Sequence, residues 1–384
     1  MPRKDRTILM NNRQTLTRRA ALGSALTLAP AAAISSRATP ASAAARPAPA
    51  PWLRYETPEA GGFSSRALAA IEQRLYALPT TSMMIVQAGK IVYDYGDISE
   101  VSYLASARKS VLSMLYGNYV AKGIIDLDRT LSDLGIDEND GGLLPIERTA
   151  TIRALLTSRS GVYFPASSAG SAAVMPPRGS ARPGAKFIYN NWDFNVAGAI
   201  FEQLTRKSIF EALQDDLAGP LGFQDFDLSR QRYVSFRSAK SRYRGYQMFL
   251  SARDMARLGV VMIQNGLWDG RRIVPEQWVR ESTSLKVPAA DVGPSSEVGY
   301  GYLWWIPTTS LRAPEWAGSF LAAGNYGQFI LGLPAVETVI VHRRAVTDQF
   351  AVARNLGDTD AAPPGVEAKT FLQIADQVIA ARTA

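Results

Sequence analysis

The strongest constraint on the fold is the order of strand-like and helix-like segments along the chain. Two β-rich runs, Ser82–Gln87 and Lys90–Tyr95, flank the dipeptide Ala88-Gly89 and predict a β-hairpin. Strand-like runs return later, and a last helix is expected over residues 369–382. These runs are Tyr302–Ile306, Ser319–Ala323, Gln328–Leu333 and Thr338–His342. Residues 106–285 have mostly helical periodicity. The simplest fold is therefore one sheet built from both ends, with a helical domain inserted between them.

The N-terminal segment has the pattern of an export signal. Residues 1–43 combine basic residues, including Arg18-Arg19, with a weakly apolar Ala-rich stretch and the small-residue site Ala41-Ser42-Ala43. The paired arginines indicate the twin-arginine route, and an ordinary Sec signal is the alternative. Residues 44–56 read as a linker. We expect a protein exported to the periplasm or the medium, cleaved after Ala43, with no stable membrane insertion.

Charge and composition exclude several classes of function. Of 42 Lys+Arg and 34 Asp+Glu, residues 1–43 hold seven basic residues and one acid, so the rest of the chain is nearly neutral and predicts no nucleic-acid partner. The absence of cysteine excludes a thiol nucleophile and a Cys zinc site. With His342 as the single histidine, a multi-histidine zinc site is also excluded, and we expect no metal or other cofactor. Hydrolytic chemistry would then depend on Ser, Lys, Tyr or carboxylates.

Two polar features of the sequence are interpreted without a functional role. His342 ends an apolar run and is expected to be a structural histidine at a strand edge. The acidic segment Asp137-Glu138-Asn139-Asp140 could bind a cation, but a solvated loop is the simpler interpretation.

The first candidate for catalysis is Ser106-Ala107-Arg108-Lys109. A serine and a lysine three residues apart at a helix start lie on one face, so the amine lies beside the hydroxyl. A lysine crowded there should titrate low enough to help remove the serine proton. The motif is short, and a serine N-cap followed by a solvated lysine is the alternative.

Two further segments could complete such a site. In Tyr189-Asn190-Asn191 the tyrosine could serve as a general base and Asn191 could bind a substrate carbonyl, with a buried tyrosine and an asparagine N-cap as the alternative. A second copy of this pattern begins at Tyr116, where core packing is expected. The small-residue run Ala322–Gln328 contains Gly324 and Asn325, whose backbone could approach a substrate; a ligand-free strand end is the alternative.

In this order the three segments resemble the serine β-lactamase and penicillin-binding superfamily, in its class C-like branch. Flanking segments agree, among them Gly123–Asp128, Leu155–Gly161 and Pro183–Tyr189. The resemblance implies a mixed α/β fold: an antiparallel sheet over residues 57–105 and 290–384, flanked by helices, and an inserted all-helical domain over 106–289 that carries the nucleophile.

The resemblance also implies roles for individual residues. Ser106 would be the acylated nucleophile, Lys109 its proton partner, and Tyr189 the base for acylation and the activator of water. Asn191 would contact a substrate amide, and the backbone N–H groups of Ser106 and Asn325 would form an oxyanion hole. The expected substrate is a small amide or ester.

The sequence departs from the β-lactamase pattern at its third segment. Ala322-Ala323-Gly324 stands where that branch has Lys-Thr-Gly, so the lysine that helps to bind a substrate carboxylate is missing. The run Gly301-Tyr302-Leu303-Trp304-Trp305-Ile306 looks closer to 6-aminohexanoate-dimer hydrolase and esterase members. Core packing is the expected role of its two tryptophans, and lining of the cleft is the alternative.

Overall fold

The computed structural model describes residues 51–169, 174–308, 313–356 and 364–383. The expected export signal and most of the linker therefore lie outside the described residues. Residues 46–384 form one compact unit. Within the described part, no helix combines the length and the apolar character needed to cross a bilayer.

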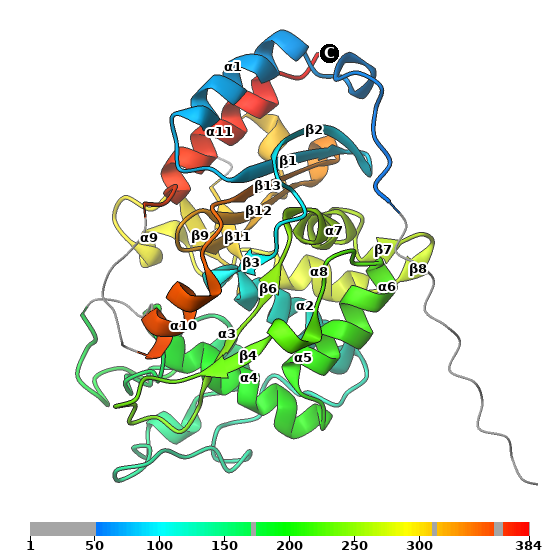
Figure 1. Ribbon diagram of the computed structural model, residues 1–384. Helices are drawn as coiled ribbons and strands as arrows, with labels where there is room; N and C mark the ends of the chain where they lie inside the picture. Colours follow the sequence, from blue (N-terminus) through cyan, green and yellow to red (C-terminus); the bar gives the residue numbers. More distant parts are fainter. Residues whose placement is uncertain (1–50, 170–173, 309–312, 357–363, 384) are drawn as a thin grey trace, which may run out of the picture. The chain divides into compact units, whose positions relative to one another are not determined.

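The centre of the fold is a seven-stranded antiparallel sheet built from both ends of the described chain (Figure 1). This confirms the predicted fold class. In spatial order its strands are β2 (Lys90–Gly96), β1 (Ser82–Gln87), β13 (Thr338–Arg343), β12 (Gln328–Leu333), β11 (Phe320–Gly324), β10 (Trp305–Pro307) and β9 (Val298–Tyr300). The N-terminal hairpin pairs with the last strand of the chain, and this pairing joins the two ends.

Side chains alternate between the two faces of the sheet, and both faces are buried. On one face Met83, Ile85 and Ile340 pack with α1 (Ser65–Tyr76) and α11 (Ala368–Ala380), which lie side by side in Figure 1. On the other face Met84 and Val339 join the larger core. The sheet is therefore the middle layer between two sets of helices.

The helix α7 (Ala252–Ile263) packs directly on that second face, against β12 and β13. Gly259 is the point of closest approach, because a Cβ built there would lie 2.4 Å from Val339 Cγ1 and 3.0 Å from Ile330 Cγ2. Its N-cap Ser251 accepts from the Asp254 backbone, while the Asp254 carboxylate accepts from the N–H groups of Gln224 and Asp225 at 2.7 and 3.0 Å. The sequence Ser251–Asp254 resembles a capping box, but the carboxylate bonds elsewhere, so the box is not formed.

The middle of the chain contains most of the helices, but it also has long irregular segments and three small strand pairs that the expectation of an all-helical domain did not include. The pairs are β3 (Ser102–Tyr103) with β6 (Phe249–Leu250), β4 (Arg232–Val234) with β5 (Gly245–Gln247), and β7 (Leu267–Trp268) with β8 (Arg271–Arg272). The helices are α2 (Arg108–Ala121), α3 (Ile152–Leu156), α4 (Asn191–Thr205), α5 (Ile209–Ala212), α6 (Gly219–Leu221), α8 (Glu276–Ser282) and α9 (Ala289–Val292), and α10 (Asp348–Leu356) lies after the sheet. The predicted domain boundaries stay a prediction.

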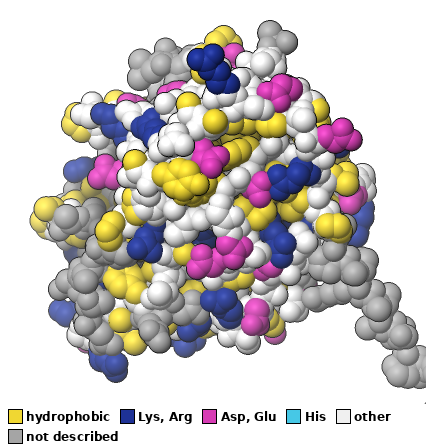
Figure 2. Space-filling model, turned by 45° about the horizontal axis from the view of Figure 1, so that its top comes forward, with side chains coloured by type: hydrophobic (Ala, Val, Ile, Leu, Met, Phe, Trp, Pro, Cys, Tyr) yellow, Lys and Arg dark blue, Asp and Glu magenta, His cyan; other side chains and the backbone are white. Residues whose placement is uncertain are grey.

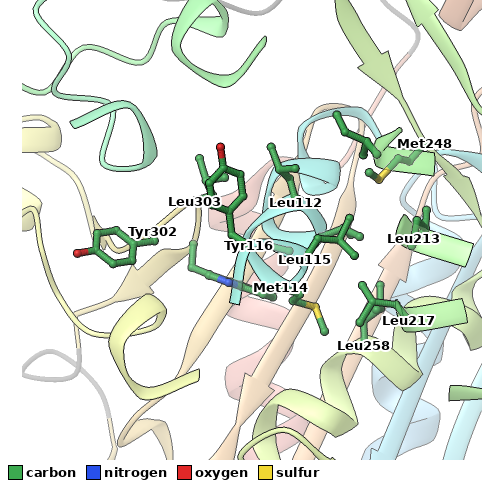
Figure 3. Packing of buried hydrophobic residues seen from close by; sticks show 14 of the residues in the cluster. Leu112, Met114, Leu115, Tyr116, Leu213, Leu217, Met248, Leu258, Tyr302 and Leu303 are labelled. Atoms are coloured by element: carbon green, nitrogen blue, oxygen red, sulfur yellow. The ribbon is translucent and has the colours of Figure 1, made fainter. Parts of the chain in front are cut away.

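The helix α2 runs through the largest core cluster. Its Leu112, Met114, Leu115 and Tyr116 side chains pack among apolar residues from several other elements (Figure 3). Nearly every side chain of α2 is buried, polar ones included, so the helix has almost no solvent-facing side. This packing fixes the position of the residues at its N-terminal end.

Candidate active site

Ser106 lies in a tight turn directly before α2. Residues Ala105–Ala107 form a single 3₁₀ turn, and Ala105 has a φ of +48°, in the left-handed region that an alanine rarely adopts. The Arg108 guanidinium donates to the Ala105 carbonyl at 2.9 Å and holds this turn. A residue in such a conformation before a candidate nucleophile is typical of functional sites.

The end of β11 lies against the same turn. A Cβ built on Gly324 would lie 2.4 Å from the Leu104 carbonyl oxygen and 3.0 Å from the Ala107 nitrogen. Only a glycine permits so close an approach of the two backbones. The structure thus brings the first and third predicted segments together, although they are more than 200 residues apart.

Ser106, Lys109 and Tyr189 form one hydrogen-bonded group. The Lys109 amine donates to Ser106 Oγ at 2.9 Å and to the Tyr189 hydroxyl at 2.7 Å. The second of these two bonds joins α2 to the segment before α4, so tertiary folding completes the group. The structure therefore places these three predicted residues at one point.

Lys109 is almost completely buried, with 2% of its surface exposed. Its amine lies 4.6 Å from the ring centre of Tyr189 and 4.5 Å from that of Phe194. Burial, together with the neighbouring Arg108 charge, holds the pKa of Lys109 well below its ordinary value of 10.5. Since the amine is neutral at a lower pH than usual, it can accept a proton from Ser106.

The Tyr189 hydroxyl, unlike the Lys109 amine, keeps its dissociable proton in the resting site. Burial raises the pKa of its hydroxyl to about 12, although the hydrogen bond with Ser106 and the Arg108 charge act against this shift. Its ring stacks on Trp305 with centres 5.5 Å apart and contacts Phe194 at 4.9 Å. The resting site therefore contains a neutral phenol, which can donate a proton as well as relay one.

A pocket of about 540 Å³ opens at this group. Its walls are mainly apolar, and of the described residues that line it Glu367 alone is charged. The lining residues are Ser106, Tyr189, Val298, Trp305, Leu321, Ala323, Gly324, Asn325, Tyr326, Phe329 and Gly365–Ala368. The predicted absence of a cation on this part of β11 thus corresponds to an apolar wall.

A second, much smaller hollow of about 50 Å³ reaches Ser106 from another side. Ser106, Asn325 and Tyr326 line both hollows, and Arg108 and Arg354 line only the small one. The Arg354 cation, on α10, also acts to lower the pKa of Tyr326 against the raising effect of burial. Cations therefore do lie close to the nucleophile turn, but they come from α2 and α10 instead of from β11.

Asn191 and Tyr116 occupy different places from the pocket lining. The Asn191 side chain is buried at the first turn of α4, where its amide donates to the Ala169 carbonyl, and its contact with substrate stays a prediction. The helix N-cap in this segment is Asn190, whose side chain accepts from Trp192 N. Tyr116 is fully buried and donates to the Ala197 carbonyl at 2.6 Å, so core packing is confirmed for this second copy of the motif.

The two adjacent tryptophans have different roles. Trp304 is buried against Phe320, as expected for core packing. Trp305 packs on two buried clusters and stacks on Tyr189, but it also lines the pocket, so the alternative of lining the cleft applies to this residue as well. The expected strand over 302–306 begins only at Trp305, because Leu303 has a φ of +62° and turns the chain.

The remaining polar candidates have structural partners. His342 lies in β13, a central strand instead of an edge, and its ring nitrogens contact Gly327 O at 2.7 Å and Thr80 Oγ1 at 2.9 Å. Burial lowers the pKa of His342 to about 4. In the acidic segment, Glu138 accepts from Trp192 Nε1 at 2.7 Å, and Asp137 pairs with Arg148 at 2.7 Å. Of the described residues, no group of three or more His, Cys, Asp and Glu side chains is placed to hold a metal ion.

Sequence reasoning missed about half of the pocket wall. Val298, Phe329 and Val366 lie outside the predicted site segments, and they meet only because β9, β12 and the segment before α11 converge at β11. The order of apolar and polar residues within a strand says which face it buries, but not which strand lies beside it.

Comparisons with known proteins find a relative in sequence and similar folds. An uncharacterised protein of Alkalihalophilus pseudofirmus is 24% identical over 255 residues, covering 62% of this chain and 69% of its own length. A candidate 6-aminohexanoate-dimer hydrolase from Bacillus anthracis has a similar structure, with a TM-score of 0.57 at 21% identity over 80% of this chain and 82% of that one. A family VIII carboxylesterase gives 0.59 at 13% identity over 86% and 99%.

The structural likeness shows a shared fold, and the family follows from the sequence. The family model described as Beta-lactamase matches residues 68–353. This segment contains Ser106, Lys109, Tyr189 and the whole of β11. The chain therefore belongs to the beta-lactamase family, within the superfamily of serine β-lactamases and penicillin-binding proteins.

Proposed function

We propose that this protein is an exported serine hydrolase that cleaves an amide or ester bond through an acyl-Ser106 intermediate. The observation that carries the proposal is the hydrogen-bonded group of Ser106, Lys109 and Tyr189 at the mouth of an apolar pocket of about 540 Å³. Nucleophilic catalysis needs a hydroxyl in contact with a group that can take its proton, and this group supplies both.

In acylation, Ser106 Oγ attacks the substrate carbonyl carbon and its proton passes to the neutral Lys109 amine. The new Oγ–C bond makes a tetrahedral oxyanion, for which the backbone N–H groups of Ser106 and Asn325 are the proposed donors. When the C–N or C–O bond breaks, the leaving group takes the Tyr189 proton, and Lys109 returns its proton to Tyr189. The raised pKa of Tyr189 and the lowered pKa of Lys109 favour this direction of transfer.

Deacylation reverses the order of proton transfers. A water molecule attacks the acyl carbon and gives a proton, through Tyr189, to Lys109. The Oγ–C bond then breaks, Ser106 Oγ recovers a proton from Lys109, and the acid leaves. We thus assign the resting base to Lys109 and the relay to Tyr189, whereas the resemblance assigned the base to Tyr189.

The pocket also indicates the kind of substrate. Apolar walls and a carboxylate at Glu367 favour an uncharged apolar group over an anionic one, because an anion would be desolvated there beside a like charge. The neighbouring solved structures described as a carboxylesterase and as a 6-aminohexanoate-dimer hydrolase support ester and amide bonds as the two classes to test.

A fluorophosphonate probe, followed by mass mapping of the adduct, tests the proposal. We expect one adduct, on Ser106, and none in Ser106→Ala. Ser110→Ala is the matched control, because Ser110 lies in the same helix with its hydroxyl buried and bonded to the Leu303 carbonyl at 2.7 Å. Absence of labelling on folded protein, with ligand binding that Ser106→Ala leaves unchanged, would instead identify a binding protein of this fold.

A further inference from the structure

The structure contains a second large pocket, of about 670 Å³, which shares no lining residue with the catalytic pocket. The charged side chains that line it have the opposite sign to the one that lines the catalytic pocket. Four of its twelve lining residues are cations, and of the described residues that line it none is a carboxylate. The twelve lining residues are Ile146, Thr149, Thr151, Arg153, Ala154, Thr157, Arg159, Arg182, Pro183, Gly184, Lys286 and Tyr302. We call this the basic pocket.

Tyr302 brings two of the cations together. Arg153 donates to the Tyr302 hydroxyl at 2.5 Å, while the Lys286 amine lies over the Tyr302 ring at 5.0 Å from its centre. The chain around Lys286 is fixed as well, since its backbone N–H donates to the Tyr300 carbonyl at 2.9 Å. Two cations held on one buried aromatic side chain form a preorganised pair.

The backbone positions the other two cations. Gly184 N donates to the Arg159 carbonyl at 2.7 Å, and Ala185 N donates to the Arg182 carbonyl at 3.1 Å. The turn that contains Arg182 is therefore hydrogen-bonded to the backbone of Arg159. Arg159 Nε is buried without a hydrogen-bond partner among the described residues, so this guanidinium has a donor to spare.

Ion pairing leaves part of this charge uncompensated. Arg153 pairs with Asp128 at 2.8 Å and Glu281 at 3.4 Å, and Arg159 pairs with Asp291, all of which lie outside the pocket lining. For Arg182 and Lys286 the structure shows no ion pair with any described carboxylate. The free cations are thus on the pocket side, where a ligand would meet them.

We propose that the basic pocket binds a small organic oxyanion, a molecule with a carboxylate or phosphate group on a compact body. Arg182 and Lys286 would contact the oxyanion, because guanidinium and ammonium groups both donate to such oxygens. Ile146, Ala154 and Pro183 would cover the body of the ligand. The volume lies within the usual range for small-molecule sites.

The basic pocket is separated from the catalytic one by packed side chains. Phe187, Val287 and Tyr300 form a buried cluster, and Trp305 and Tyr189 of the catalytic pocket pack against it. Val287 follows Lys286 of the basic pocket directly in the chain, so the cluster adjoins both sites. A ligand in the basic pocket would therefore not touch Ser106. The proposal is independent of hydrolase activity and can be tested on a protein that lacks the nucleophile.

The test is calorimetric titration of the Ser106→Ala protein at low salt with citrate, and separately with glycerol phosphate. We expect saturable binding of at least one of them, and the stronger of the two tells carboxylate from phosphate ligands. Adding Arg182→Gln and Lys286→Gln should weaken binding at least tenfold. The matched control is Arg66→Gln with Lys122→Gln, which removes the same charge from exposed sites and again includes a lysine over a tyrosine ring, at 5.4 Å.

Three outcomes would overturn the proposal: no binding of either anion, equal weakening in the control protein, or full binding after loss of Arg182 and Lys286. Thermal melting checks that each variant is folded, and the two single variants replace the double one if it is not. Ester hydrolysis should be measured in a protein that keeps Ser106 and carries only Arg182→Gln and Lys286→Gln. Its rate should equal that of the unmodified protein. Loss of anion binding with normal hydrolysis would separate this site from the proposed function.

Discussion

Removal of one oxygen atom from Tyr189 is the sharpest test of the catalytic group. Tyr189→Phe keeps the ring that stacks on Trp305 and packs on Phe194, so the pocket wall should stay in place. It removes the hydroxyl that accepts from Lys109 at 2.7 Å. The relay between Lys109 and the leaving group would then be broken in both half-reactions.

We expect kcat/KM to fall about 10²–10⁴-fold, the range usual for loss of one acid–base group. This corresponds to about 3–5 kcal/mol of transition-state stabilisation. The free energy of unfolding should change by only about 1 kcal/mol, the net contribution of one hydrogen bond. The assay is hydrolysis of a chromogenic ester, with the Ser106→Ala protein as the background, beside a urea denaturation curve.

Tyr116→Phe is the matched control, because it removes a buried hydroxyl bonded to Ala197 O at 2.6 Å in the same core. It should cost a similar amount of stability and leave kcat/KM within about twofold, since the hydroxyl lies away from the pocket lining. Full activity of Tyr189→Phe together with lost activity of Tyr116→Phe would refute the assignment of the site. Loss of activity in both, with unchanged folding, would show that the effect is not specific to Tyr189.

Three further predictions use the same assay. Because burial lowers the pKa of Lys109, the amine is protonated, and kcat/KM lost, only as pH falls through a value well below 10.5; a profile that rises near pH 10 would contradict this. Gly324→Ala should reduce kcat at least tenfold, because its Cβ would lie 2.4 Å from a carbonyl oxygen of the nucleophile turn. Gly293→Ala is the control and should leave kcat unchanged, because no atom lies within 4 Å of a Cβ built there. Equal effects of the two substitutions would refute the close approach at Gly324. Trp305→Leu should raise KM with little loss of stability, because Trp305 lines the pocket. Trp304→Leu should leave KM similar and lower the free energy of unfolding by roughly 2–3 kcal/mol, because Trp304 is buried. The reverse pattern would exchange the roles of the two tryptophans.

Local patterns predicted those features that depend on neighbours in the chain. The hairpin over β1 and β2, the strands β12 and β13 and the last helix were found within one or two residues, because alternation and helical spacing are local properties. The spacing of Ser106 and Lys109 also placed their side chains together without any tertiary information. Tyr302–Trp304 were expected to be strand but form a turn, which a β-rich composition does not reveal.

The charge pattern was also readable from sequence. Outside residues 1–43 the basic and acidic residues nearly balance, and Figure 2 shows a face on which Lys/Arg and Asp/Glu side chains are interspersed instead of gathered by sign. The expectation of no nucleic-acid partner stays a prediction, since nucleic-acid binding requires an extended basic field. The local clustering in the basic pocket is different, because its four cations lie up to 133 residues apart in the chain.

Sequence by itself determined the order of elements, the two partners Ser106 and Lys109, and the resemblance that singled out Tyr189 and Gly324. Only the tertiary structure decided the distance from Lys109 to Tyr189 and the burial that lowers the pKa of the amine. It also decided that Trp304 is buried in the core while Trp305 lines the pocket. The physical reason is that a pKa and a pocket wall depend on what surrounds a side chain in space. Those surroundings come from β9, β11, β12 and α4, which the chain brings together only when the sheet is complete.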